Sequence, residues 1–450
     1  YAEDDSRVEA FAKAYCDFIN NGKTERECVA YGEKLAKAHG FEDLNAVIRS
    51  GRKLEAGARV YANWMGKSFM LFVLGAKPLE EGMNILGAHI DSPRIDVKQN
   101  PLYEDGDLAY LDTHYYGGIK KYQWVSMPLA LHGVIIKKNG EKVPVIIGED
   151  ENDPVFCISD LLIHLAQEQM AKNAKDVVEG EALNLIVGGR PLAGEEKDAV
   201  KANVLKLLDD KYGVEEEDFL SAELEIVPAG KARDMGFDRS MILGYGHDDR
   251  VCAYPSMMAV LDYEGTPDYT LCCIITDKEE IGSVGATGMA SHYLENTVAE
   301  LYACTADYCE LAVRRCLRNS RMLSSDVSAG YDPNFASAFE KKNSAFLGRG
   351  ICFNKFTGSR GKSGSNDANP EFMASLRKIM DDAGVAFQTA ELGRVDAGGG
   401  GTIAYIPAKY GMDVIDSGVA VLSMHSPWEV TSKADIYEAF KGYQAFLKNA

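Results

Sequence analysis

Two adjacent glutamates, Glu279 and Glu280, follow an apolar run over 270–276 that is typical of a buried strand. One carboxylate of such a pair can bind a metal ion while its neighbour accepts and returns protons. A strand that ends in a solvent-exposed acidic turn would show the same pattern. Glycines recur every third residue over 282–288, which predicts a helix with one closely packed face.

Four further predicted strands also end in histidine or carboxylate. These groups are His89 with Asp91, His247 with Asp248 and Asp249, Asp326, and His425. Ligands of open α/β sheets bind at the carboxyl ends of the strands, so these groups would meet at one edge. Imidazole and carboxylate without thiolate suit Zn²⁺, Mn²⁺ or Co²⁺. Because one catalytic zinc does not bind so many groups, we expect two metal ions that share a bridging carboxylate.

Each of these residues also has an ordinary structural explanation. A histidine at a strand end commonly makes only hydrogen bonds, and an aspartate there is often a helix N-cap. His247 and Asp249 could both be explained in this way. The whole set is harder to explain in this way, because three of the eight histidines of the chain belong to it.

Strands and helices are expected to alternate on both sides of a central block. The predicted strands cover 59–62, 68–75, 83–89, 241–245, 270–276, 301–305, 322–325 and 419–424. The predicted helices lie within 6–40, over 250–261 and 370–384, and after a capping box at Ser432–Asp435. This pattern predicts an α/β fold, with a mainly parallel sheet flanked by helices.

The block at 100–236 differs from the rest of the chain. It is β-rich, has predicted helices over 159–173 and 195–212, and supplies few candidate ligands. We therefore predict an inserted domain at 100–236 and a catalytic domain formed by 1–99 and 237–450.

Composition excludes several classes of partner. The 450 residues are 46% hydrophobic and carry a formal net charge of −20, which argues against nucleic acid and anionic membranes. No apolar run reaches the roughly 18–20 residues of a membrane span, and no signal-peptide core is recognisable. The ten cysteines form no CxxC pair, so we expect a cytoplasmic protein with reduced thiols. The stretch 358–365 lacks the first glycine of a phosphate-binding loop.

Four motifs resemble the M18 metallo-aminopeptidases, the family of aspartyl aminopeptidase and vacuolar aminopeptidase I. They are Ala88-His-Ile-Asp-Ser-Pro93, Asp277-Lys-Glu-Glu-Ile-Gly-Ser283, Ser324-Ser-Asp-Val327 with Asp332-Pro-Asn334, and Ser423-Met-His-Ser426. They occur in the order found in that family and span nearly the whole chain. The resemblance implies an aminopeptidase that uses two divalent metal ions, with Zn²⁺ first and Co²⁺ or Mn²⁺ as alternatives.

The resemblance also implies roles for individual residues. It implies that His89 and Asp326 bind one metal, that Glu280 and His425 bind the other, and that Asp248 bridges the two. Asp91 would orient His89, as the carboxylate partner of a metal-bound imidazole usually does. Glu279 would be the general base. Asp249 remains a rival for Asp248, and Asp307 remains a rival for Asp326.

Relatives that prefer acidic first residues carry a lysine where Cys352 stands in this sequence. Arg349 and Lys355 lie near that position but do not match it. We therefore predict a neutral or broad preference for the first residue of a peptide. Gly398–Thr402 is similar to a segment that lines the site in the family, although a mobile loop would have the same composition.

The resemblance further implies dimers that assemble into a dodecamer through the inserted domain. A histidine of that domain reaches a neighbouring subunit's site in relatives, and His164 is the candidate here. Two other functions stay open. One is a related metal amidohydrolase, such as a deacylase or carboxypeptidase, and the other is a catalytically silent assembly protein.

Overall fold

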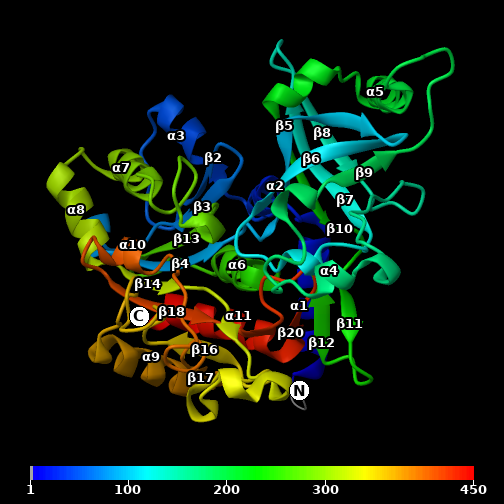
Figure 1. Cartoon of the computed structure of the whole chain (residues 1–450). Helices are drawn as coiled ribbons and strands as arrows, with labels where there is room; N and C mark the ends of the chain where they lie inside the picture. The colour runs from blue at the N-terminus through cyan, green and yellow to red at the C-terminus, as the bar shows by residue number, and fades with distance from the viewer. Residues whose placement is uncertain (1–3) are drawn as a thin grey trace. The chain divides into compact units, whose positions relative to one another are not determined.

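The computed structural model describes residues 4–450, which form two compact units (Figure 1). The first unit contains the chain up to Asp91, Ala232–Met424 and Glu429–Ala450, and the second contains Ser92–Lys231 and His425–Trp428. The boundaries therefore lie 8 residues before the expected 99/100 junction and 5 before the expected 236/237 junction. One reason is that β5 (Arg94–Asp105) belongs wholly to the sheet of the second unit.

A nine-stranded mixed sheet forms the centre of the first unit, in the order β1-β2-β3-β13-β4-β14-β18-β16-β17. These strands are Glu42–Asp43, Arg59–Trp64, Ser68–Val73, Thr270–Thr276, Met83–His89, Arg321–Ser324, Asp413–Gly418, Ile351–Asn354 and Phe387–Thr389. The central strands β13, β4, β14 and β18 run parallel, whereas β2–β3, β3–β13 and β18–β16 are antiparallel. The α/β class is confirmed, with a sheet that is parallel at its centre and mixed toward its edges.

Helices cover both faces of this sheet. Because side chains alternate along a strand, Leu86 packs in one core and Ile85 in the other. The first core includes side chains of α1 (Asp5–Asn21), α2 (Glu25–Ala38), α6 (His247–Leu261), α9 (Pro370–Ala383) and α11 (Lys433–Asn449). The second includes α3 (Leu44–Ser50), α7 (Tyr293–Thr305), α8 (Glu310–Asn319) and α10 (Tyr405–Ala408).

A five-stranded sheet, β11-β12-β20-β19-β15, also belongs to the first unit. Its strands are Arg233–Met235, Met241–Gly244, Glu429–Ser432, Ala420–Leu422 and Ser328–Ala329. The expected strands 241–245 and 419–424 both lie in this smaller sheet. The central strand β18 had not been expected, because polar residues and a glycine interrupt its apolar run at 413–418.

The second unit is built on a six-stranded antiparallel sheet, β8-β7-β10-β5-β6-β9. Apart from β5, its strands are Lys142–Ile147, Leu129–Ile136, Ala222–Pro228, Leu108–Tyr116 and Leu185–Gly188, and helix α5 covers Ala199–Tyr212. The helix expected over 159–173 is wrong. Only the 3-10 turn η3 (Ile163–Leu165) and the single turn α4 (Gln167–Met170) form there. The large apolar side chains of this segment stay exposed, so the burial that stabilises most protein helices is missing.

Three other expectations are corrected in the first unit. The strand expected over 301–305 is the end of α7, where Leu301 and Cys304 are buried at helical spacing. The glycines over 282–288 follow a 3-10 turn, η6 (Glu279–Ile281), and Gly282 and Gly285 have the positive φ of turns. No capping box forms at the start of α11, because the buried Asp435 accepts hydrogen bonds from the amides of Gly348 and Gly350.

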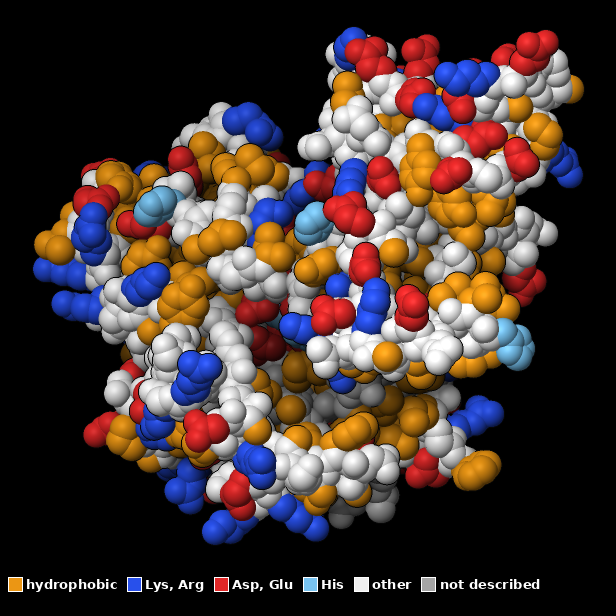
Figure 2. Space-filling model, viewed as in Figure 1, with side chains coloured by type: hydrophobic (Ala, Val, Ile, Leu, Met, Phe, Trp, Pro, Cys, Tyr) orange, Lys and Arg blue, Asp and Glu red, His pale blue; other side chains and the backbone are white. Residues whose placement is uncertain are grey.

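Within residues 4–450, no helix has both the length and the apolar character needed to cross a membrane. On the face drawn in Figure 2, acidic and basic side chains are interspersed, and hydrophobic side chains surface in patches. This face therefore has no continuous basic surface of the kind that binds nucleic acid.

Candidate metal centre

The candidate ligands of the first unit come from both of its sheets. His89 is the last residue of β4, Glu279 and Glu280 follow its neighbour β13, and Asp326 follows β14. Asp248 instead follows β12 of the five-stranded sheet and lies at the start of α6. The parallel strands thus deliver three of the expected strand ends to one edge, and the smaller sheet adds a fourth.

His89 is at the centre of this group. Its Nε2 lies 3.2 Å from Asp248 Oδ1, 3.9 Å from Glu279 Oε2 and 4.0 Å from Asp326 Oδ1. The side chains of His89 and Asp248 are buried, while those of Asp326 and Glu279 are 12% and 14% exposed. The group is therefore buried at its base and open to solvent on the side of Asp326 and Glu279.

The donor set fits a divalent metal site. One potential ligand atom each of His89, Asp248 and Asp326 lies within 4.8 Å of the others, and the same holds for His89, Glu279 and Glu280. Burial, together with the charges of Asp248 and Glu279, raises the pKa of Asp326 well above its ordinary value. Carboxylates that repel one another in this way are stabilised by a cation, and imidazole with carboxylate is a donor set that zinc accepts.

The protonation of His89 reflects the same crowding. Burial by itself would lower its pKa, but Asp248, Asp91 and Glu279 together raise it well above the ordinary value. A proton on His89 then takes the place that a metal cation would fill. Metal binding at this imidazole must displace that proton, so it competes with acid.

Asp91 connects the histidine to the glutamate pair. Its backbone carbonyl lies 3.0 Å from His89 Nδ1, and its Oδ1 lies 3.4 Å from the same nitrogen. Its two carboxylate oxygens accept hydrogen bonds from the backbone amides of Glu279, at 3.0 Å, and Glu280, at 3.1 Å. Asp91 therefore fixes the orientation of the imidazole and the start of the acidic turn together.

The rival residues occupy other places. Asp249 Oδ2 accepts a hydrogen bond from the backbone amide of His89. Asp307 is exposed after α7, and no candidate ligand group among the described residues includes it. His247 is buried, with Nδ1 2.6 Å from the Tyr15 hydroxyl and Nε2 3.2 Å from the Ile242 carbonyl. Burial lowers the pKa of His247 to about 3, so it is a neutral histidine that makes structural hydrogen bonds.

His425 lies in the short segment His425–Trp428, which is grouped with the second unit although Met424 and Glu429 on either side belong to the first. Its Nδ1 is 3.1 Å from the carbonyl oxygen of Gly118. That contact holds one ring nitrogen of His425 against the backbone, which fixes the orientation of the imidazole.

Cys352, at the position expected to set first-residue preference, is buried in β16. Burial raises the pKa of its thiol to about 12, and its Sγ lies 3.3 Å from Asn354 Oδ1. The two nearby cations have other partners: Lys355 pairs with Asp367, and Arg349 lies over the Phe346 ring. A neutral thiol therefore occupies this position.

Asp416 is a buried acid that was not among the predicted site residues. It lies in the unexpected central strand β18 and is 2% exposed. Burial raises the pKa of its carboxyl to about 7, while the Thr402 side chain beside it lowers the pKa and the charge of Glu279 adds to the rise. The available signal was an acidic residue inside the stretch 414–422, where Ser417 is the other polar side chain.

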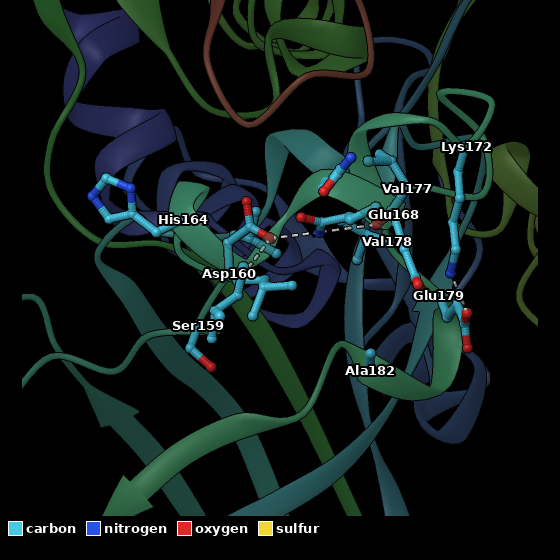
Figure 3. A pocket seen from close by; sticks show the side chains of 14 residues that line it. Ser159, Asp160, His164, Glu168, Lys172, Val177, Val178, Glu179 and Ala182 are labelled. Carbon is cyan, nitrogen blue, oxygen red and sulfur yellow. Dashed lines mark hydrogen bonds and ion pairs between the residues drawn. The ribbon is translucent and has the colours of Figure 1, made fainter.

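His164 lies in the second unit, on the wall of a surface hollow of about 620 Å³. Its side chain is exposed, and Figure 3 shows the ring turned away from the ion pair of Lys172 with Glu179. The position leaves its imidazole accessible from outside the unit.

Comparisons with known proteins agree with these motifs. A model of the aminopeptidase I zinc metalloprotease family (M18) matches residues 18–447. A probable M18 family aminopeptidase 1 of Clostridium acetobutylicum is 60% identical over 443 residues, which are 98% of this chain and 95% of that protein. The crystal structure of an M18 family aminopeptidase from Thermotoga maritima superposes with a TM-score of 0.94 at 43% identity, covering 99% of this chain and 97% of that one.

A more distant structure, the mApe1 dodecamer of S. cerevisiae, shares the fold with a TM-score of 0.77 at 22% identity, over 97% of this chain and 96% of that one. The family model and the close relatives cover nearly the whole chain. This protein therefore belongs to the M18 family of zinc metallo-aminopeptidases, and it is an aminopeptidase.

Proposed function

We propose that this aminopeptidase holds two divalent metal ions, most favourably Zn²⁺. His89 and Asp326 bind one ion, Glu280 and His425 bind the other, and Asp248 bridges them. The observation that carries this proposal is the position of His89 Nε2, between 3.2 and 4.0 Å from three carboxylates. Asp248 and Glu280 also have ligand atoms within 4.8 Å of each other, as a bridging and a terminal carboxylate require.

The residues of the chain divide the chemistry between them. When bound, two cations lower the pKa of a shared water molecule and polarise the scissile carbonyl. Glu279 accepts a proton from that water molecule and returns it to the leaving amine. Asp91 supports metal binding and proton transfer, because it holds the imidazole of His89 and the backbone of Glu279 in place.

Metal analysis tests the centre directly. The purified protein should contain two metal ions per chain, lose activity on exhaustive chelation, and regain activity with Zn²⁺, Co²⁺ or Mn²⁺. A single bound ion, or full activity after complete metal removal, would refute the two-metal proposal. Anomalous scattering from crystals would identify the ions and show whether Asp326 or Asp307 binds them.

For substrates, the proposal is a neutral or broad first-residue preference. It is supported by the buried thiol of Cys352 and by the engagement of Lys355 with Asp367. A panel of aminoacyl-nitroanilides should give Leu and Met rates at least equal to those for Asp and Glu. Rates for Asp or Glu far above those for Leu would contradict it. Hydrolysis of N-acyl amino acids in preference to free peptides would favour a deacylase instead.

We also propose self-association through the second unit, into dimers and a dodecamer. Exposed apolar side chains in the segment 161–170 support this proposal, as does the dodecameric state of the S. cerevisiae relative. His164 in this segment would then contribute to the site of a neighbouring subunit. Light scattering and native mass spectrometry would give the number of chains in the assembly.

A further inference from the structure

Asp416 has the features of a ligand-binding carboxylate rather than a structural one. It is buried in β18, where the Thr402 side chain hydrogen-bonds its carboxylate, but no cation or backbone amide of the described residues does so. A buried carboxylate without such partners is costly. Its burial is therefore best explained if a positively charged group comes to it during function.

Strand pairing places Asp416 on the face of the sheet that carries the metal centre. Asp416 is paired with Ser324 of β14, and Ser324 is paired with Gly87 of β4. Paired residues point to the same face, and alternate residues along a strand share that face. His89, two residues beyond Gly87, is therefore on the same side of the sheet as Asp416.

Strand pairing also relates Asp416 to Cys352, the residue predicted to influence the first-residue preference. On its other side, Asp416 is paired with Asn354 of β16, and Cys352 lies two residues before Asn354. Asp416 therefore lies in the row of side chains between the strand that carries His89 and the strand that carries Cys352. The proposed function puts the scissile bond at His89 and the first side chain of the peptide at Cys352, so the N-terminal residue of a bound peptide would lie along this row.

Other buried acids near the centre already have partners. Asp91 accepts two backbone amides, and Asp249 accepts the amide of His89. Glu279 is partly exposed, and the proposed function assigns it to proton transfer. Asp416 is close enough to Glu279 for their charges to interact, and Thr402 lies beside its carboxyl. Its position is thus near the reacting groups without belonging to the metal ligands.

Every aminopeptidase substrate carries a free α-ammonium group, which needs an anionic acceptor in a site poor in water. We propose that Asp416 binds the α-ammonium group of the first residue of the substrate. Charge-assisted hydrogen bonds of this kind are strong in a buried setting. The inference rests on the proposed location of the metal centre, because that centre fixes where the scissile bond must lie.

A pair of inhibitors tests the proposal. Leucine hydroxamate and 4-methylpentanohydroxamate share the metal-binding group and the side chain, but only the first has an α-amino group. Wild-type enzyme should bind leucine hydroxamate at least about tenfold more tightly, as expected for an ammonium–carboxylate contact. In Asp416→Asn this ratio should fall to within about twofold, while the affinity for 4-methylpentanohydroxamate and the metal content stay unchanged.

Asp413→Asn is the matched control, since Asp413 begins the same strand and bonds Asn369 at the surface. It should leave the inhibitor ratio unchanged. A ratio in Asp416→Asn that equals the wild-type ratio would overturn the proposal. An equal loss of affinity for both inhibitors would also overturn it, because that result indicates a structural role. So would a changed ratio of the rates for Lys and Leu substrates together with an unchanged inhibitor ratio, because that result indicates recognition of the substrate side chain.

A crystal structure of the wild-type enzyme with leucine hydroxamate keeps the proposal testable if Asp416→Asn does not fold. The α-nitrogen should lie within hydrogen-bonding distance of the Asp416 carboxylate, and a longer separation would overturn the assignment. A failure of the two-metal proposal would give a different result, because the wild-type protein would then lack the metal ions. The inhibitor ratio tests Asp416 separately, since both inhibitors bind the metal through the same hydroxamate group.

Discussion

The first unit contains a cluster of buried charged side chains, whereas the second unit contains a cluster of exposed apolar side chains. Around His89, the carboxylates of Asp91 and Asp248 are almost inaccessible. In the segment 161–170 of the second unit, Ile163 and Leu165 are 69% and 67% exposed. Buried charges need a counter-charge, and clustered exposed apolar side chains need a covering surface. We therefore expect each region to be completed from outside the single chain, the first by metal ions and the second by another protein surface.

The largest effect should come from removing the proposed bridge. Asp248→Ala should abolish the binding of both metal ions and reduce activity by about 10³-fold or more, because one ligand serves both sites. Metal analysis and peptidase assays would measure these losses. Asp307→Ala, on an exposed residue after α7, should change neither quantity. Two fully bound ions in Asp248→Ala would show that the buried charge is not a metal bridge.

Glu279→Gln should separate metal binding from proton transfer. Activity should fall by about 10²–10⁴-fold, since an amide cannot act as a general base. The metal content should remain at the wild-type value, because Glu280 and not Glu279 is the proposed ligand. Metal loss in Glu279→Gln would instead assign both glutamates to the centre, and retained hydrolysis would require another base.

The double variant Ile163→Ser with Leu165→Ser tests whether the exposed apolar segment 161–170 is covered by another protein surface. The variant should form smaller assemblies, because these side chains would lose the burial gained in an interface, roughly 1.5–3 kcal/mol for each fully buried residue. Native mass spectrometry would detect the change. Val395→Ser is a suitable control, since Val395 is 73% exposed but lies in the first unit. Unchanged assembly in the double variant would mean that the segment is not an interface.

Cys352→Lys asks whether a single buried side chain sets the first-residue preference. A lysine there should raise the rate for Asp and Glu substrates relative to Leu by about tenfold, since it supplies an opposite charge in a poorly solvated place. Ratios of kcat/KM for aminoacyl-nitroanilides would report the change, with Cys352→Met as a neutral control of similar length. An unaltered ratio would place the specificity pocket elsewhere.

The smallest effect concerns a buried acid away from the centre. Burial raises the pKa of Asp435 to about 7, whereas an unfolded aspartate titrates near 3.9. The folded state therefore retains a proton between these values, and the free energy of unfolding should fall as pH rises from about 4 to 7. The slope contributed by this group is at most about 1.4 kcal/mol per pH unit. Asp435→Asn should remove that contribution in chemical unfolding measured across this pH range, and an unchanged slope would contradict it.

Much of the fold was readable from local pattern. The helices α1 and α2, the hairpin of β2 and β3, and strands β4 and β13 follow hydrophobic periodicity, and the structure confirms them. Periodicity failed at 301–305 and 159–173. A short apolar run fits a helix as well as a strand, and an apolar stripe forms a stable helix only where something covers it.

The types and the order of the candidate site residues were determined by the sequence, because histidine and carboxylate at the ends of predicted strands form a pattern that the sequence alone shows. Only the tertiary structure showed that Asp248 follows a strand of a second sheet, that Asp91 joins His89 to the acidic turn, and that Asp416 lies on the same face of the central sheet as His89. The physical reason is that strand pairing and burial join residues more than 100 positions apart. Local periodicity carries no information about such neighbours.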